Sequence, residues 1–301
     1  MTALEHIDDT LRQQFLAFQE SLLEHKDTTK KVFFGRLSGN EPLFCTGLLI
    51  NHNELLNQLL RPMLYVAGIQ FCAKEDFTHY LKYYLNSVKN SDYLGVWGGG
   101  GPMEQQGEFF LDFCDPHGTN FNRFRASVLD MGIYSCIPEY NISPFFENKK
   151  VLVITSHKET TIQQLPKYDK LFEKPIFHET TQFHVYKPPQ QNAGNQDTHS
   201  WVWHFDKMKE DLKTIKENEF DFDIALVSCG GFGMPISDYI HGVLDTSVIY
   251  VGGALQLWFG INGKRWEENP KVKYSVNDHW VNVLDEDKPK QPELAEGGAY
   301  W

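Results

Sequence analysis

Hydrophobic and polar positions along the chain form two alternating patterns: short apolar runs, and apolar residues spaced three or four positions apart. Short, nearly continuous apolar runs recur between polar or glycine-rich segments, as is typical of strands buried on both faces of a parallel sheet. The pattern predicts strands at residues 32–37, 92–97, 151–156, 182–186, 224–227 and 248–251.

Between these runs, apolar residues return at three- and four-residue steps, which predicts amphipathic helices. The first contains Leu4, Ile7, Leu11, Phe15, Phe18 and Leu22 and packs on the main domain or forms a dimer contact. Other helices are expected at residues 54–60 and 77–88, after residues 157–161 to about residue 172, and at residues 201–217. We interpret residues 98–102 as a loop and residues 103–125 as a loop with helical pieces.

Alternating strands and helices predict an α/β fold: a Rossmann-like, mostly parallel sheet flanked by helices. Residues 1–28 would form the N-terminal helix. Residues 29–301 would form a single α/β domain whose two halves meet near residues 141–150.

Composition narrows the possible partners. The chain has 40 acidic and 28 basic residues and a net charge of −12, which argues against nucleic acid and anionic membranes. No segment has the length and apolarity of a membrane span. Its 5 cysteines lack metal-binding spacing and are expected as free thiols, so a cytoplasmic location is predicted.

A glycine-rich loop follows the strand at 224–227. Gly230, Gly231 and Gly233 surround Phe232, and Pro235 suits the first turn of a helix. Strand, glycine loop and helix start together predict a site for a nucleotide or another phosphate-bearing ligand. The spacing is not that of a dinucleotide fingerprint or a P-loop, and a plain tight turn is the alternative.

Polar residues stand at several predicted strand ends, which share one edge of a parallel sheet. They are Arg36, Ser38, Glu41, Asp92, His157, Ser228 and Gln256, and the strand at 248–251 ends in Gly252 and Gly253. Arg36 suits a diphosphate, and Glu41 suits a divalent cation. The alternative for each is a solvated surface residue. Histidines 178, 184, 199, 204, 241 and 279 show no ligand-like pairing and are expected to be structural or surface residues.

Residues 36–41, Arg-Leu-Ser-Gly-Asn-Glu, resemble the R-x-G-D-G-E motif of the GT-D-fold glycosyltransferases, formerly a domain of unknown function with relatives in glycan-building loci. Similar segments continue over residues 30–301. They include the loop at 230–233, the strand end at 250–253, and residues 259–266, 277–280 and 296–301. The resemblance to the family is most specific in the last third of the chain.

The resemblance implies transfer of a sugar from a nucleotide sugar to a glycan hydroxyl. A UDP-linked sugar is the first expectation for the donor. The candidates for the base that takes the acceptor proton are Glu41, Asp92 and His157, in that order. The nucleotide sugar would be bound by Arg36, Ser38, Gly230, Gly231, Phe232, Gly233, Gly252, Gly253 and Gln256.

One position departs from the family motif. Gly39 stands where the family has an aspartate, so Glu41 alone remains to hold Mn²⁺ or Mg²⁺. The site would then use another donor such as Asp92, or work without metal through Arg36 and the loop amides. This departure favours the second hypothesis, a catalytically silent relative that binds a nucleotide or glycan as a partner subunit. A homodimer is a further expectation.

Overall fold

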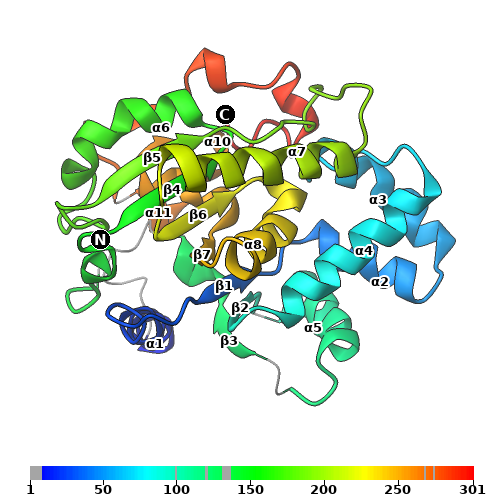
Figure 1. The fold of residues 1–301 in the computed structure, drawn as a ribbon, viewed down its shortest axis with the longest axis horizontal. Coiled ribbons are helices and arrows are strands. Elements are labelled where there is room, and N and C mark those ends of the chain that lie inside the picture. Colours follow the sequence, from blue (N-terminus) through cyan, green and yellow to red (C-terminus); the bar gives the residue numbers. More distant parts are fainter. Residues whose placement is uncertain (1–8, 99, 119–120, 131–136, 268, 274) are drawn as a thin grey trace.

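The computed structural model describes residues 9–98, 100–118, 121–130, 137–267, 269–273 and 275–301. Within these ranges, one seven-stranded sheet forms the centre of the molecule, and all of its neighbouring strands run parallel (Figure 1). The strand order is β3-β2-β1-β7-β6-β4-β5. This confirms the predicted α/β, Rossmann-like fold.

The strands of this sheet are β1 (Phe33–Arg36), β2 (Tyr93–Val96), β3 (Asn122–Arg125), β4 (Lys150–Thr155), β5 (Gln182–Tyr186), β6 (Ile224–Ser228) and β7 (Ser247–Tyr250). Strands β4 and β6 are almost completely buried, which explains their continuous apolar sequence. A second, two-stranded parallel sheet joins β8 (Ile261–Asn262) to β9 (Val281–Asn282).

The helices are α1 (Asp9–Leu23), α2 (Asn40–Leu49), α3 (Asn53–Tyr65), α4 (Lys74–Lys89), α5 (Pro102–Cys114), α6 (Lys158–Gln164), α7 (Trp201–Thr214), α8 (Gly233–Gly242), α9 (Leu255–Trp258), α10 (Lys264–Glu267) and α11 (Pro270–Lys273). Helices α2, α3, α4, α5, α7 and α8 contribute to the apolar core on one face of the sheet. Helices α1 and α9 contribute to the core on the other face. Successive strand ends therefore send the chain to opposite faces, which opens a crevice at the carboxyl edge.

Two regions differ from the sequence prediction. Residues 40–49 form α2, which the periodicity misses because most of the helix is buried and shows no polar face. Pro42 fits there because it lies in the first turn. The interpretation of residues 103–125 as mostly loop is wrong: α5 is a continuous helix that begins at Pro102, and β3 forms the edge strand.

The N-terminal helix packs on its own chain. Phe15, Phe18 and Leu22 are buried, and the ring of Phe18 lies 5.6 Å from that of Phe34 in β1. The expected positions Leu4 and Ile7 lie outside the described residues. The division into residues 1–28 and 29–301, and the homodimer, stay predictions.

Strands β3 and β4 lie in different halves of the sheet, and the described residues between them include the short helical turn Ser143–Phe146. Pairing of β1 with β7 joins the two halves into one sheet. Cys45, Cys72 and Cys229 carry free thiols. Among the described helices, none is both long and apolar enough to cross a membrane.

Candidate functional site

A cavity of about 500 Å³ opens at the carboxyl edge of the large sheet. Strands β4, β6 and β7 end at its floor in register, since Thr155 pairs with Ser228 and Val227 pairs with Tyr250. Its walls come from Val66, Ala67 and Gly68, from Trp97, Met103 and Gln106, from residues 188–192, and from Glu296, Tyr300 and Trp301. Cavities of this size are typical of small-molecule sites, and the position is where parallel α/β sheets bind ligands.

Arg36 ends β1 and lines this cavity. One guanidinium nitrogen donates to the Val251 carbonyl at 3.2 Å, and the Cζ atom lies 4.8 Å from the centroid of the Trp97 ring. Its Nε atom is buried without a hydrogen-bond partner, and no carboxylate of the described residues forms an ion pair with it. Arg36 therefore offers a positioned positive charge, not engaged in a described ion pair, to an anion in the cavity.

Glu41 lies beside Arg36, in the first turn of α2, and is 4% exposed. Its carboxylate accepts a hydrogen bond from the Ser38 hydroxyl. Burial raises the pKa of Glu41, while the bond from Ser38 and the charge of Arg36 act in the opposite direction. A carboxyl with a raised pKa at a cavity wall is suited to proton transfer.

His157 follows β4 and is 5% exposed at the cavity wall. Its Nε2 atom is buried without a hydrogen-bond partner. Burial lowers the pKa of His157 to about 4, and the charge of Asp287 opposes this shift. The imidazole is therefore neutral at pH 7, and its ring lies 6.4 Å from that of Trp301.

The glycine loop does not present its backbone amides to the cavity. The Gly231 N–H donates to the Ala67 carbonyl at 2.8 Å, the Phe232 N–H to Cys229 at 3.3 Å, and the Gly233 N–H to Gly230. The expectation that the amides of residues 231–233 meet a phosphate is therefore wrong for this arrangement. Gly230 and Phe232 still line the cavity, together with Ser228.

The loop glycines instead permit close packing. A Cβ atom on Gly231 would lie 2.5 Å from Ile69, and one on Gly233 would lie 2.2 Å from the Tyr250 ring. Gly230 has φ +56° and approaches the Ala67 carbonyl. These contacts require glycine for reasons of space and backbone conformation, independently of any ligand.

The glycines after β7 shape the cavity directly. A Cβ atom on Gly252, which has φ +68°, would lie 2.0 Å from the Arg36 guanidinium. One on Gly253 would lie 2.5 Å from the Tyr300 ring, so the C-terminal segment packs over this turn. The Tyr300 hydroxyl accepts a hydrogen bond of 2.7 Å from Arg265, and both residues line the cavity.

Two predicted site residues lie elsewhere. Asp92 precedes β2, at the opposite end of the strand from the cavity, where it accepts a hydrogen bond from the Phe33 N–H at 2.9 Å. Its placement at the carboxyl edge was wrong because the strand begins, rather than ends, there. Gln256 lies buried in α9 and donates to the Ile261 carbonyl at 3.1 Å, outside the described cavity lining.

Several lining residues gave no clear signal in the sequence. Trp97 supports Arg36, and the segment at 188–192 closes one side. Arg265 forms an ion pair of 3.2 Å with Glu296 and brings the tail to the cavity. The adjacent aromatic residues Tyr300 and Trp301 were an available clue, because large aromatic side chains are usually well buried.

The donor set around Glu41 does not fit a protein-held metal. Ser38 already donates to its carboxylate, Arg36 places a positive charge beside it, and Gly39 supplies no carboxylate. Within the described ranges, the group of three metal-ligating side chains that converge lies elsewhere, at Asp197.

Comparisons of this chain with protein-family models, curated proteins and solved structures give no match. The cavity brings together an arginine without a described ion pair, a buried carboxyl and a neutral histidine.

Proposed function

We propose that this chain is a nucleotide-sugar-dependent glycosyltransferase that moves a sugar to a glycan hydroxyl. The observation that carries the proposal is Arg36, held by Val251 and Trp97 at the cavity without a described carboxylate partner. A planar guanidinium of this kind suits a diphosphate, the group that departs in such a reaction.

Aromatic walls are the second support. Trp97, Tyr250, Tyr300 and Trp301 line the cavity beside the charged residues. Their faces can stack on a nucleobase or on the C–H face of a sugar, while Arg36 binds the phosphates between them.

The reaction would proceed by attack of an acceptor hydroxyl on the anomeric carbon. The new bond forms between that carbon and the acceptor oxygen, and the bond from the carbon to the phosphate oxygen breaks. Arg36 stabilises the charge that develops on the departing diphosphate. Glu41, when ionised, takes the acceptor proton, and burial makes this carboxylate a stronger base than an exposed one. Neutral His157 supplies a hydrogen-bonding group without adding charge.

Gly39 supports the second candidate, a silent relative that binds the nucleotide sugar without turnover. A Cβ atom at this position would lie 3.2 Å from the Met103 methyl group, so the place of the family aspartate is crowded here. The two candidates share the binding site and differ only in chemistry.

A paired experiment separates them. Thermal-shift screening of UDP-, GDP-, CDP- and dTDP-linked sugars is expected to find one donor class that stabilises the protein, by about 2.7 kcal/mol at 100 times its Kd. Release of nucleoside diphosphate with a panel of glycan acceptors then measures turnover. Binding with turnover supports the transferase, binding without turnover supports the silent relative, and absence of binding to all four classes contradicts both.

A further inference from the structure

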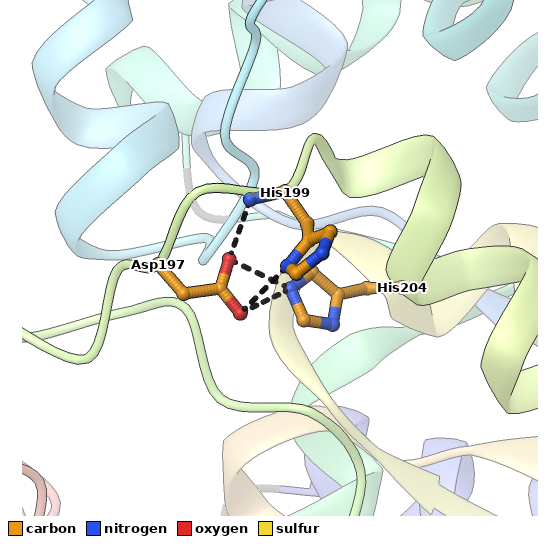
Figure 2. A group of neighbouring side chains, drawn as sticks. All are labelled: Asp197, His199 and His204. Atoms are coloured by element: carbon orange, nitrogen blue, oxygen red, sulfur yellow. Dashed lines mark hydrogen bonds and ion pairs between the residues drawn. The ribbon is translucent and has the colours of Figure 1, made fainter.

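A second cluster of chemically active side chains lies on the segment that joins β5 to α7 (Figure 2). Asp197 and His199 come from the loop and His204 from the first turns of α7. The His204 Nε2 atom lies 3.0 Å from an Asp197 carboxylate oxygen, and the His199 Nδ1 atom lies 3.5 Å from the same oxygen. The sequence interpretation that these histidines lack a ligand-like pairing is wrong, because the bend at residues 198–199, just before α7, brings both rings to one aspartate.

These separations match those of ligands around one metal ion. Zinc binds imidazole nitrogen at about 2.0–2.1 Å in tetrahedral geometry, so neighbouring ligand atoms stand about 3.3 Å apart. The observed 3.0 and 3.5 Å lie on either side of that value, and all three ligand atoms lie within 4.8 Å of one another. A small rotation of the exposed His199 ring completes the arrangement.

The surroundings hold the carboxylate in the orientation that ligation needs. The other Asp197 oxygen, Oδ1, accepts hydrogen bonds from the His199 N–H at 2.9 Å and from the Gln191 side chain at 3.5 Å. Gln191 is 2% exposed and also donates to the His199 carbonyl at 2.9 Å. Its own Oε1 atom is buried without a partner. These hydrogen bonds hold the carboxylate so that Oδ2 lies near both rings, while the His204 Nε2 atom also lies 3.1 Å from Oδ1. Such an ordered outer shell is typical of metal sites.

Exposure differs among the three side chains in a way that suits an open coordination position. Asp197 and His199 are 45% and 44% exposed, whereas His204 is 9% exposed. The buried ring anchors the cluster to α7, and the exposed side admits water to the remaining position. His199 is further held by Trp203, whose ring centroid lies 4.0 Å away.

We propose that Asp197, His199 and His204 bind one divalent transition-metal ion, with two imidazole nitrogens and one carboxylate oxygen as its protein ligands. This donor set suits Zn²⁺ rather than Mg²⁺ or Ca²⁺, which prefer oxygen. The site is separate from Glu41, and it contacts the cavity through Gln191, which lines the cavity wall. The metal therefore ties the wall at residues 188–192 to α7. The proposal does not depend on the proposed function.

The test is equilibrium dialysis of chelator-treated protein against ZnCl₂. The wild type is expected to bind one Zn²⁺ per chain and to melt at a higher temperature with zinc than without it. His199→Ala and Asp197→Asn, at exposed positions, are expected to bind Zn²⁺ at least 10-fold more weakly and to lose the zinc-dependent rise in melting temperature. His117→Ala, an exposed histidine on another loop, is the matched control and should behave like the wild type.

Circular dichroism of the zinc-free proteins shows that each variant is folded, and His199→Gln provides a polar replacement if the alanine variant is unstable. The proposal is overturned if the wild type binds no stoichiometric zinc, or if the folded variants at position 199 bind zinc with the wild-type stoichiometry and affinity. In the second outcome, the cluster is only a set of hydrogen bonds around Asp197.

Discussion

The ends of β1 and β6 reach the same cavity, but their polar groups are used differently. After β6, the N–H groups of Gly231, Phe232 and Gly233 all donate to carbonyls of the protein itself. At the end of β1, the Arg36 guanidinium keeps a buried nitrogen without a partner, and within the described ranges no carboxylate pairs with it. The residues with the stronger sequence signal are thus satisfied internally, while a single arginine remains available to a ligand.

This contrast shows what a glycine-rich loop does and does not indicate. Glycines mark places where the backbone turns or something approaches closely. Here the approaching groups are Ile69 and Tyr250, rather than a phosphate. The end of β1 has a hydrogen-bond donor left for a ligand, whereas the donors after β6 are used within the protein. No sequence pattern shows which donors remain unused.

The largest expected effect concerns the β1 side. Glu41→Gln removes the carboxylate charge but keeps an acceptor for the Ser38 hydroxyl. We expect turnover to fall about 100-fold or more, since general-base catalysis contributes factors of about 100 to 10,000. Donor affinity should change by less than about threefold. Steady-state kinetics with isothermal titration measures both.

Asp92→Asn is the matched control, because this carboxylate lies at the other end of β2 and should leave turnover unchanged. Equal turnover of wild type and Glu41→Gln would remove Glu41 from the reaction and leave Arg36 as a binding residue only.

A change on the β6 side is expected to act through stability. The new Cβ atom of Gly233→Ala would lie 2.2 Å from the Tyr250 ring, which is held by its hydrogen bond of 3.0 Å to Gly230. We expect a loss of about 1–3 kcal/mol in unfolding free energy. Gly242→Ala, in the same helix, meets nothing within 4 Å and is the control. Chemical denaturation of both variants compares them, and equal stability would contradict the packing interpretation of the loop.

A smaller effect is expected from His157. Its pKa is about 4 in the folded protein against 6.5 for the free side chain, so the unfolded chain takes up the proton first as pH falls. Stability from the neutral ring is complete above pH 6.5 and is lost progressively between pH 6.5 and 4. From pH 7 to 5.5 the loss should be about 1 kcal/mol. Denaturation of wild type and His157→Gln across this range measures it, and identical pH profiles would show that His157 is not buried as a neutral base.

The fold was largely predictable from sequence because buried parallel strands are continuous apolar runs, as at β4 and β6. Helix α2 was not, since a helix buried on most sides lacks a polar period. Within the site, Arg36, Glu41 and His157 were found as polar residues at strand ends. The prediction for Asp92 was wrong because Asp92 comes just before β2. A residue before a strand lies at the opposite edge of a parallel sheet from a residue after it.

The remaining site residues depend on tertiary folding. Arg265 reaches the cavity only because the tail returns to pack on Gly253, and the Asp197 cluster forms only when the loop before α7 folds back. Neither contact has a local sequence period, so spacing alone could not indicate them.

The most direct test of the contrast between β1 and β6 is the binding of UDP, GDP, CDP and dTDP to wild type and Arg36→Gln, measured by isothermal titration. We expect the nucleotide that binds best to lose about 10- to 100-fold in affinity in the variant, corresponding to a charge-assisted hydrogen bond of roughly 1.5–3 kcal/mol. Arg61→Gln, an exposed arginine on α3, should bind like the wild type. Equal affinity of wild type and Arg36→Gln would show that Arg36 is not the anion site and would contradict the account.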